Sequence, residues 1–268
     1  MSLAGIAALA AAMPLPTADA SPSRPVLPPA APPPGRYLFE DNFDGPAGSA
    51  PDYSKWEPAL AREDMEDPTF WELPENVGQY RDDRRNLFGD GKSNLVIRAA
   101  KEGNSYFSGK LFGKYRGPIG TTWEARIKLN CLTPGCWPAW YLANNSPVNG
   151  GEVDIMEWYG NGSWAPGTTI HAKLNGGEHV SHTIAPDSGW HTWRAQWDDA
   201  GIRFWQDYVD GVQPYFNVAA SALPDWPFNT PGYTLFPILN LAVAGSGGGD
   251  PRGGTYPADM LVDWVRVW

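Results

Sequence analysis

Residues 123–129 read Trp-Glu-Ala-Arg-Ile-Lys-Leu, and apolar side chains alternate with charged ones along the whole stretch. Successive side chains of an extended chain point to opposite faces. The apolar set consists of Trp123, Ala125, Ile127 and Leu129. The charged residues between them fall on the other face, so the stretch predicts a β-strand with one face in a core.

Extended stretches of this kind recur on both sides, separated by clusters of Gly, Pro, Asn and Asp. They are residues 94–99, 137–142, 152–158, 168–174, 190–197, 202–208, 237–243 and 260–268. No convincing amphipathic helix and no internal repeat is found. The 30 glycines and 27 prolines favour short strands joined by turns. We therefore predict an all-β fold, a curved antiparallel sandwich of two sheets.

The N-terminal residues differ in composition from the rest. Residues 3–15 form an apolar run of small side chains, and Ala18-Asp19-Ala20 has the small-x-small form of a signal-peptide cleavage site. Residues 21–35 are rich in Pro and Ala, which is typical of an extended linker. We expect residues 1–20 to be a signal peptide, residues 36–268 to form the catalytic sandwich domain, and the protein to be secreted or extracytoplasmic.

The charge balance restricts the partners of the chain. A net charge of −10 opposes binding to nucleic acid and to anionic membrane surfaces. A neutral polysaccharide meets no such repulsion. We expect a monomer that acts on a polysaccharide, without nucleic acid or membrane partners.

Two cysteines, Cys131 and Cys136, flank Leu-Thr-Pro-Gly. Their spacing excludes a redox Cys-x-x-Cys motif. In an exported protein this arrangement predicts a disulfide across the turn rather than free thiols.

Chemistry is concentrated in residues 151–158, Gly-Glu-Val-Asp-Ile-Met-Glu-Trp. Burying carboxylates in an apolar strand is costly, so three acids within six residues favour catalysis over structure. In a regular strand Glu152 and Asp154 share a face and Glu157 does not. A β-bulge at Ile155-Met156 would bring Glu157 to their face and leave Val153 and Trp158 in the core. An acidic edge strand or a calcium site is the alternative.

The spacing of the glutamates suits glycoside hydrolysis. Four rises place their Cα atoms roughly 13 Å apart. Converging side chains could narrow the carboxyl gap to the ~5–5.5 Å of a retaining glycosidase, rather than the ~6.5–9.5 Å of an inverting one. Crowding keeps one carboxyl protonated, so that one acid can donate a proton while the other attacks.

The segment Glu-Val-Asp-Ile-Met-Glu resembles the signature of glycoside hydrolase family 16 in its laminarinase-like form. The resemblance extends in order and spacing over residues 37–268. It includes residues 39–45, 54–56, 115–129, 137–140, 190–192, 209–211, 239–243 and 261–268. It implies a concanavalin A-like jelly roll and an endo-acting, retaining β-1,3-glucanase with no cofactor needed for catalysis. Glu152 would be the nucleophile, Glu157 the acid/base and Asp154 their helper.

Further residues are candidates for substrate binding. Trp137 and Trp140 cannot share a face of a regular strand, so one is expected to stack on a sugar and the other to pack in the core, although the resemblance favours cleft roles for both. His171 is expected to hydrogen-bond near the scissile bond, and Asn76 is a weaker candidate for a sugar hydroxyl. Residues 147–150 and the glycine-rich residues 245–254 depart from the family pattern, which leaves the preferred linkage open.

The resemblance also implies a structural calcium ion where the first and last strands meet, bound by backbone oxygens near Asn42 and Gly45 and by Asp263. A hydrogen-bonded carboxylate is the alternative for Asp263, which lies between Val262 and Trp264 in an expected strand.

Two other functions remain open. The same machinery could act on mixed-linkage β-glucan, on a galactan, or in transglycosylation. A non-catalytic, lectin-like carbohydrate-binding protein is the rival from a different class, because this fold also serves lectins. Binding alone needs aromatic platforms and hydroxyl partners, so the two glutamates favour the enzyme.

Overall fold

The computed structural model describes residues 36–60, 78–173 and 178–268. The expected signal peptide, the linker and Asn76 lie outside the described residues.

The described residues form two β-sheets that are antiparallel except for one parallel pair, β3 with β6. The first sheet has the order β16-β15-β14-β9-β18-β5-β6-β3, with β1 paired to β18 and β4 to β5. Its strands are β1 (Phe39–Asp41), β3 (Gly78–Tyr80), β4 (Leu87–Gly89), β5 (Leu95–Glu102), β6 (Ser105–Ser108), β9 (Thr122–Asn130), β14 (Trp190–Asp198), β15 (Gly201–Gln206), β16 (Phe216–Ala219) and β18 (Ala258–Val267).

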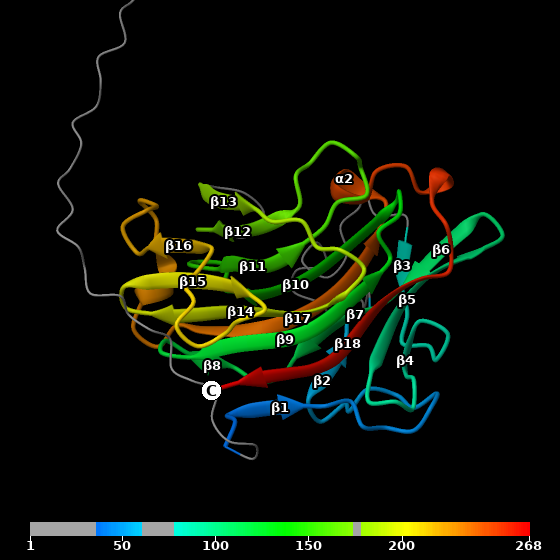
Figure 1. Ribbon diagram of the computed structural model, residues 1–268, viewed down its shortest axis with the longest axis horizontal. Coiled ribbons are helices and arrows are strands. Elements are labelled where there is room, and N and C mark those ends of the chain that lie inside the picture. Colours follow the sequence, from blue (N-terminus) through cyan, green and yellow to red (C-terminus); the bar gives the residue numbers. More distant parts are fainter. Residues whose placement is uncertain (1–35, 61–77, 174–177) are drawn as a thin grey trace, which may run out of the picture.

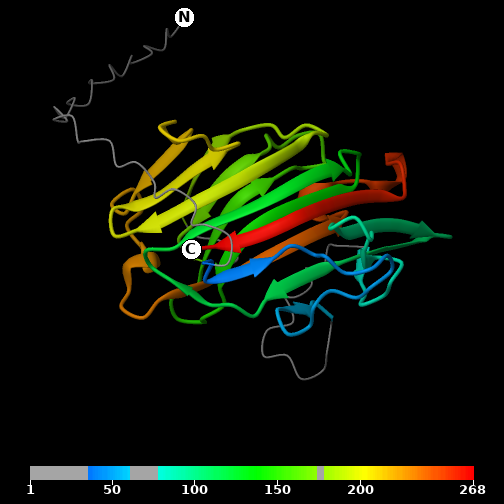
Figure 2. The ribbon, with the colours of Figure 1, turned by 60° about the horizontal axis from the view of Figure 1, so that its bottom comes forward.

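The second sheet has the order β13-β12-β11-β10-β17-β7-β2, with β8 paired to β17. Its strands are β2 (Trp56–Pro58), β7 (Lys110–Gly113), β8 (Gly117–Pro118), β10 (Cys136–Asn144), β11 (Gly151–Glu157), β12 (Gly167–His171), β13 (His179–Thr183) and β17 (Thr234–Val243). Figures 1 and 2 show both sheets as curved layers. The predicted all-β sandwich is confirmed.

Helical structure is limited to three short segments among the described residues. They are α2 (Gly245–Gly248) and the 3-10 turns Pro227–Asn229 and Pro251–Gly253. In this part of the chain no helix has the length and apolar character needed to cross a membrane.

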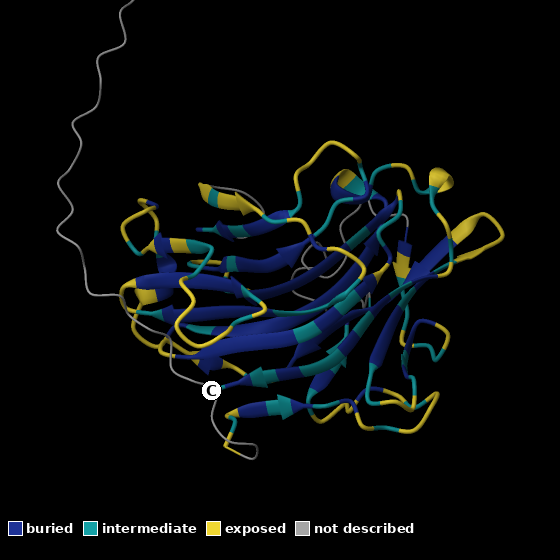
Figure 3. Ribbon diagram, in the orientation of Figure 1, coloured by how far each residue is buried: buried dark blue, intermediate teal, exposed yellow. Residues whose placement is uncertain are grey.

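The main core lies between the sheets, and the alternation that predicted β9 builds part of it. Trp123, Ala125, Ile127 and Leu129 are all buried there. On the opposite face of β9, Glu124 pairs with the buried Arg194 of β14, which compensates the charge. Buried residues follow most of the strands and exposed ones gather mainly in the turns, although the edge strand β13 is largely exposed (Figure 3).

A second, smaller apolar cluster lies on the other face of the second sheet. It consists of Ala59, Phe112, Ala139, Tyr141, Ala143, Phe236 and Ile238. These residues alternate along β10 and β17 with main-core residues such as Trp140 and Leu239. Tyr141 is opposite Asp154 in the pairing of β10 with β11, so this cluster shares its face with the acids. We call this face of the second sheet the active face.

The predicted disulfide is absent from the structure. Cys131 and Cys136 are buried free thiols. Burial raises the pKa of Cys136 to about 12 and holds the pKa of Cys131 well above its usual value. Because the thiolate is the reactive form, both side chains behave here as small core residues.

Candidate active site

Strand β11 carries the predicted bulge. Its pairing with β10 places Asp154 opposite Tyr141 and Met156 opposite Trp140, so Ile155 is the extra residue. The pairing with β12 shifts at the same place. Val153, Ile155 and Met156 pack in the main core. The bulge at Ile155-Met156 is confirmed, and it brings all three acids to the active face. Trp158, predicted to be buried, is only half-buried against the core.

Two hydrogen bonds hold Glu157. The indole Nε1 of Trp137 donates to Oε1 at 2.8 Å, and the hydroxyl of Tyr159 donates to Oε2 at 2.6 Å. Burial raises the pKa of Glu157, and the two donors act against this rise. Both carboxyl oxygens are therefore fixed in position while the group remains more basic than an exposed glutamate.

Asp154 and Glu152 form the other half of the site. Asp154 is buried, and its Oδ2 lies 3.2 Å from Nε2 of His171 on β12. Burial, followed by the charge of Glu157, raises the pKa of Asp154, and a hydrogen bond with Glu152 opposes the rise. Burial and the charge of Asp154 likewise hold the pKa of Glu152 well above its usual value. The three carboxyls cannot all ionise easily, so a proton is retained among them toward neutral pH.

A lysine adds positive charge to this site. Lys110 of β7 is buried on the active face, with its Nζ 5.7 Å from the ring centroid of Tyr141. Burial lowers the pKa of Lys110 to about 8, and the charge of Glu152 opposes this shift. When charged, Lys110 in turn favours the carboxylate form of Glu152. This is the form that a nucleophile requires.

Trp137 and Trp140 lie on opposite faces of β10, as the alternation of a regular strand requires. Trp137 contacts Glu157 on the active face, whereas Trp140 is fully buried in the main core. The expectation of a cleft role for Trp140 is therefore wrong. His171 lies at the site, next to Asp154. Sequence reasoning missed Lys110 and Tyr159, although Tyr159 follows the last acid by two positions.

The glycine-rich segment, residues 245–254, packs against the indole of Trp137. A Cβ atom on Gly247 of α2 would lie 2.6 Å from Cε2 of Trp137, well inside van der Waals contact. A Cβ atom on Gly248 would lie just as close to the carbonyl oxygen of Gly135. Side chains at these positions would push the indole or the turn away.

Gly247→Ala should therefore lower kcat by about 10–100-fold, because it displaces Trp137 and weakens its hydrogen bond to Glu157. Gly253→Ala is the matched control, since its Cβ would meet only Pro134 at an ordinary 3.9 Å. Steady-state kinetics and thermal melting of both variants check this. Equal kcat values for the two variants would contradict the role given to Gly247.

Tyr159→Phe should shift the alkaline limb of the pH–rate profile to higher pH. The hydroxyl stabilises the Glu157 carboxylate, so its loss raises the pKa of Glu157 and the acid keeps its proton longer. Tyr53→Phe removes a similar 2.6 Å bond to Asp82 away from the acids and serves as control. A limb that stays in place or moves to lower pH in Tyr159→Phe would refute the assignment of Glu157 as the titrating acid.

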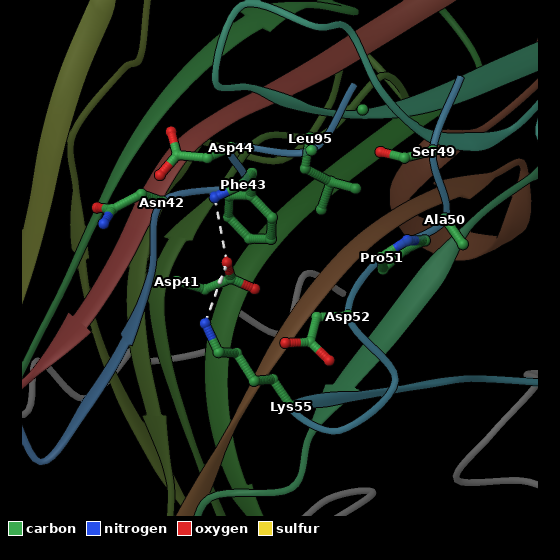
Figure 4. A pocket seen from close by; sticks show the side chains of 12 residues that line it. Asp41, Asn42, Phe43, Asp44, Ser49, Ala50, Pro51, Asp52, Lys55 and Leu95 are labelled. Carbon is green, nitrogen blue, oxygen red and sulfur yellow. Dashed lines mark hydrogen bonds and ion pairs between the residues drawn. The ribbon is translucent and has the colours of Figure 1, made fainter. Parts of the chain in front are cut away.

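The side chains at the implied calcium site already have partners within the protein. Asn42 and Gly45 line a pocket of about 330 Å³ with Asp41 and Lys55, but Asp263 does not line it (Figure 4). Asp263 pairs instead with Arg126, and the side-chain oxygen of Asn42 accepts a hydrogen bond from Arg266.

The carboxylate of Asp41 is also hydrogen-bonded within the protein, because it accepts from the backbone N–H of Phe43 and from Nε1 of Trp56. Within the described ranges no group of three or more His, Cys, Asp or Glu side chains could hold a metal ion. The hydrogen-bonded alternative for Asp263 is confirmed, and the calcium ion, whose other implied ligands are backbone oxygens, stays a prediction.

Two glutamates and an aspartate on one face of a bulged strand provide the carboxylate pair that glycoside hydrolases use. The family model described as "Glycosyl hydrolases family 16" matches residues 78–264. The chain belongs to this family.

Among curated proteins, the chain is 29% identical to "Glucan endo-1,3-beta-glucosidase A1" of Niallia circulans over 86% of its own length and 37% of that protein. The chain thus spans little more than a third of that relative.

Two solved structures are much closer in sequence. A β-1,3-glucanase from Mycobacterium marinum is 71% identical, with a TM-score of 0.80, over 87% of this chain and 99% of that one. An immunostimulatory antigen and pseudo β-1,3-glucanase of Mycobacterium tuberculosis is 56% identical, with a TM-score of 0.80 and the same coverage of both chains.

Proposed function

We propose that the chain hydrolyses internal β-1,3 linkages of a laminarin-type glucan by double displacement, with retention of configuration. The observation that carries this is the bulge in β11, which places Glu152, Asp154 and Glu157 together on the active face. The relatives named as β-1,3-glucanases support the substrate class.

In the first step the carboxylate of Glu152 attacks the anomeric carbon, while Glu157 gives its proton to the departing glycosidic oxygen. In the second step Glu157 takes a proton from water, which attacks the same carbon and releases Glu152. Asp154, held by His171, forms a hydrogen bond with Glu152 and positions it. Trp137 and Tyr159 aim the carboxyl of Glu157.

We place this reaction outside the cytoplasm, because residues 1–20 have the pattern of a signal peptide. A monomer is sufficient for it, because all the groups named come from one chain.

The test is the size of the products from laminarin, lichenan, agarose and carrageenan. Short oligosaccharides from laminarin alone are expected, with NMR showing that the first-formed anomer is β. Products from lichenan alone would mean a mixed-linkage specificity, and an α anomer would overturn the retaining mechanism.

Glycan binding without catalysis is the second candidate. It is favoured by the printed description of the Mycobacterium tuberculosis relative as a pseudo β-1,3-glucanase. A protein of this kind would bind laminarin with unchanged affinity in Glu152→Ala and release no product even as the wild type.

A further inference from the structure

A pocket of about 550 Å³ opens beside the acids, over β12, β13 and the turn that follows β11. This volume lies within the range of small-ligand sites. Most of its lining residues carry a hydroxyl or an imidazole group, among them Ser163, Thr169, His171, His179 and Ser181. Among the described residues, none that lines the pocket is Asp, Glu, Lys or Arg. Such a wall suits a neutral ligand with many hydroxyl groups.

One wall of the pocket is the indole of Trp164, which is 50% exposed. Its ring stands edge-on to Tyr159, at 5.3 Å and 77°, and edge-on to Trp137, at 6.4 Å and 89°. Two aromatic neighbours thus fix the ring while half of its surface stays open to solvent. An exposed, fixed indole is a suitable platform for the apolar face of a sugar ring.

The turn that carries Trp164 is organised by Asn161. Its Oδ1 accepts hydrogen bonds from the backbone N–H of Ser163 at 2.9 Å and of Trp164 at 3.0 Å. Its Nδ2 donates to the carbonyl of Ser246 at 2.8 Å, and its backbone N–H donates to that of Gly247. The glycine-rich segment therefore supports Trp164 as well as Trp137, and the platform is formed before a ligand binds.

We propose that Trp164 and this pocket bind the sugar ring on the leaving-group side of the scissile bond. Trp164 contacts Trp137 and Tyr159, the two donors to Glu157. In the proposed mechanism Glu157 protonates the oxygen of the departing sugar, so a ring held beside these donors belongs to the departing part. The inference rests on the proposed function and adds a specificity-determining residue to it.

The first experiment measures binding of laminarihexaose to Glu157→Gln by calorimetry, with and without Trp164→Ala. Adding Trp164→Ala to Glu157→Gln should weaken the binding of laminarihexaose about tenfold, which corresponds to ~1.4 kcal/mol. Trp164→Phe should recover most of the loss. Trp264→Ala, which removes a half-buried indole from the other sheet, should leave the affinity unchanged.

The second experiment identifies the side of the bond. In the active protein, Trp164→Ala should lower kcat/KM for laminarihexaose about tenfold, but for an aryl β-laminaribioside, which has no sugar on the leaving side, only about twofold. Asn161→Ala should act in the same direction as Trp164→Ala. Asn161→Asp keeps the acceptor for both backbone N–H groups and should restore most of the rate.

Each failure has its own signature. Unchanged affinity in the Glu157→Gln, Trp164→Ala double variant overturns the pocket assignment and leaves the proposed function standing. Equal losses on both substrates overturn the leaving-group side. If Glu157→Gln binds no laminarihexaose at all, the proposed substrate is wrong, and the inference is wrong with it.

Discussion

Replacing Glu152 with Ala should reduce laminarin hydrolysis by about 10⁴-fold or more, because no covalent glycosyl intermediate can form. The substitution also removes a buried carboxyl whose pKa is held well above its usual value by burial and by the charge of Asp154. The fold should therefore be retained or stabilised at neutral pH. Added azide can enter the vacated space and attack from the side of Glu152, which gives an α-linked product from a β-glucan.

The measurement is product stereochemistry by NMR, with an activated aryl glycoside as donor. Glu102→Ala is the control, because it removes an exposed carboxylate that pairs with Arg81 and Arg85 away from the acids. Its activity should match the wild type. A β-linked azide product from Glu152→Ala would show that Glu152 is not the nucleophile.

Glu157→Ala should have a different effect, because it removes the proton donor and leaves the nucleophile. Laminarin hydrolysis should fall by about 10²–10⁴-fold. Aryl glycosides with good leaving groups need no protonation, so they should still form the covalent intermediate. Azide should then attack that intermediate from the face opposite Glu152 and give a β-linked product.

The pH profile provides a second readout for Glu157→Ala. With activated substrates its alkaline limb should disappear, since the group whose raised pKa sets that limb is absent. If the α product appears instead, the two roles are reversed. If both glutamate variants hydrolyse laminarin normally, this pair is not catalytic.

The fold could be predicted because long strands show a clear alternation of apolar and polar residues in the sequence. The alternation of residues 123–129 reflects burial on one face, and β9 extends only one residue beyond it at each end. Strands of three or four residues, such as β2 and β7, are too short to show a period, so alternation did not predict them, and β1 was expected only from the family resemblance. The stretch 168–174 was predicted too long, because β12 ends at His171.

The bulged strand β11 could be predicted because the chemistry of its acids and its periodicity disagreed. Catalysis requires all three acids on one face of the strand, but regular alternation places Glu157 on the opposite face. A bulge is the simplest structure that brings the three side chains together. Trp137 and Trp140 could be placed on opposite faces, but not assigned to them. That choice depends on how β10 pairs with β11 and β17, which is not a local property of the sequence.

Other parts of the site depend on long-range pairing. Lys110 reaches the active face through the sheet order β11-β10-β17-β7, although more than 40 residues separate it from Glu152. Trp164 depends on the contact of its turn with α2. The partner of Asp263 is Arg126, which the neighbouring strand β9 supplies. No local pattern reveals these pairs.

The bulge in β11 also makes the strand tolerant of a change in length. In an ordinary strand, loss of one residue reverses the face of every side chain that follows. Without Ile155 the sequence becomes Glu-Val-Asp-Met-Glu, in which plain alternation keeps all three acids on the active face. Met156 would take the core position of Ile155, at a cost of about 2–5 kcal/mol for one lost buried side chain. A gene could therefore lose this codon and still encode the same arrangement of acids, whereas single-codon losses within β10 or β12 would invert the residues that surround them.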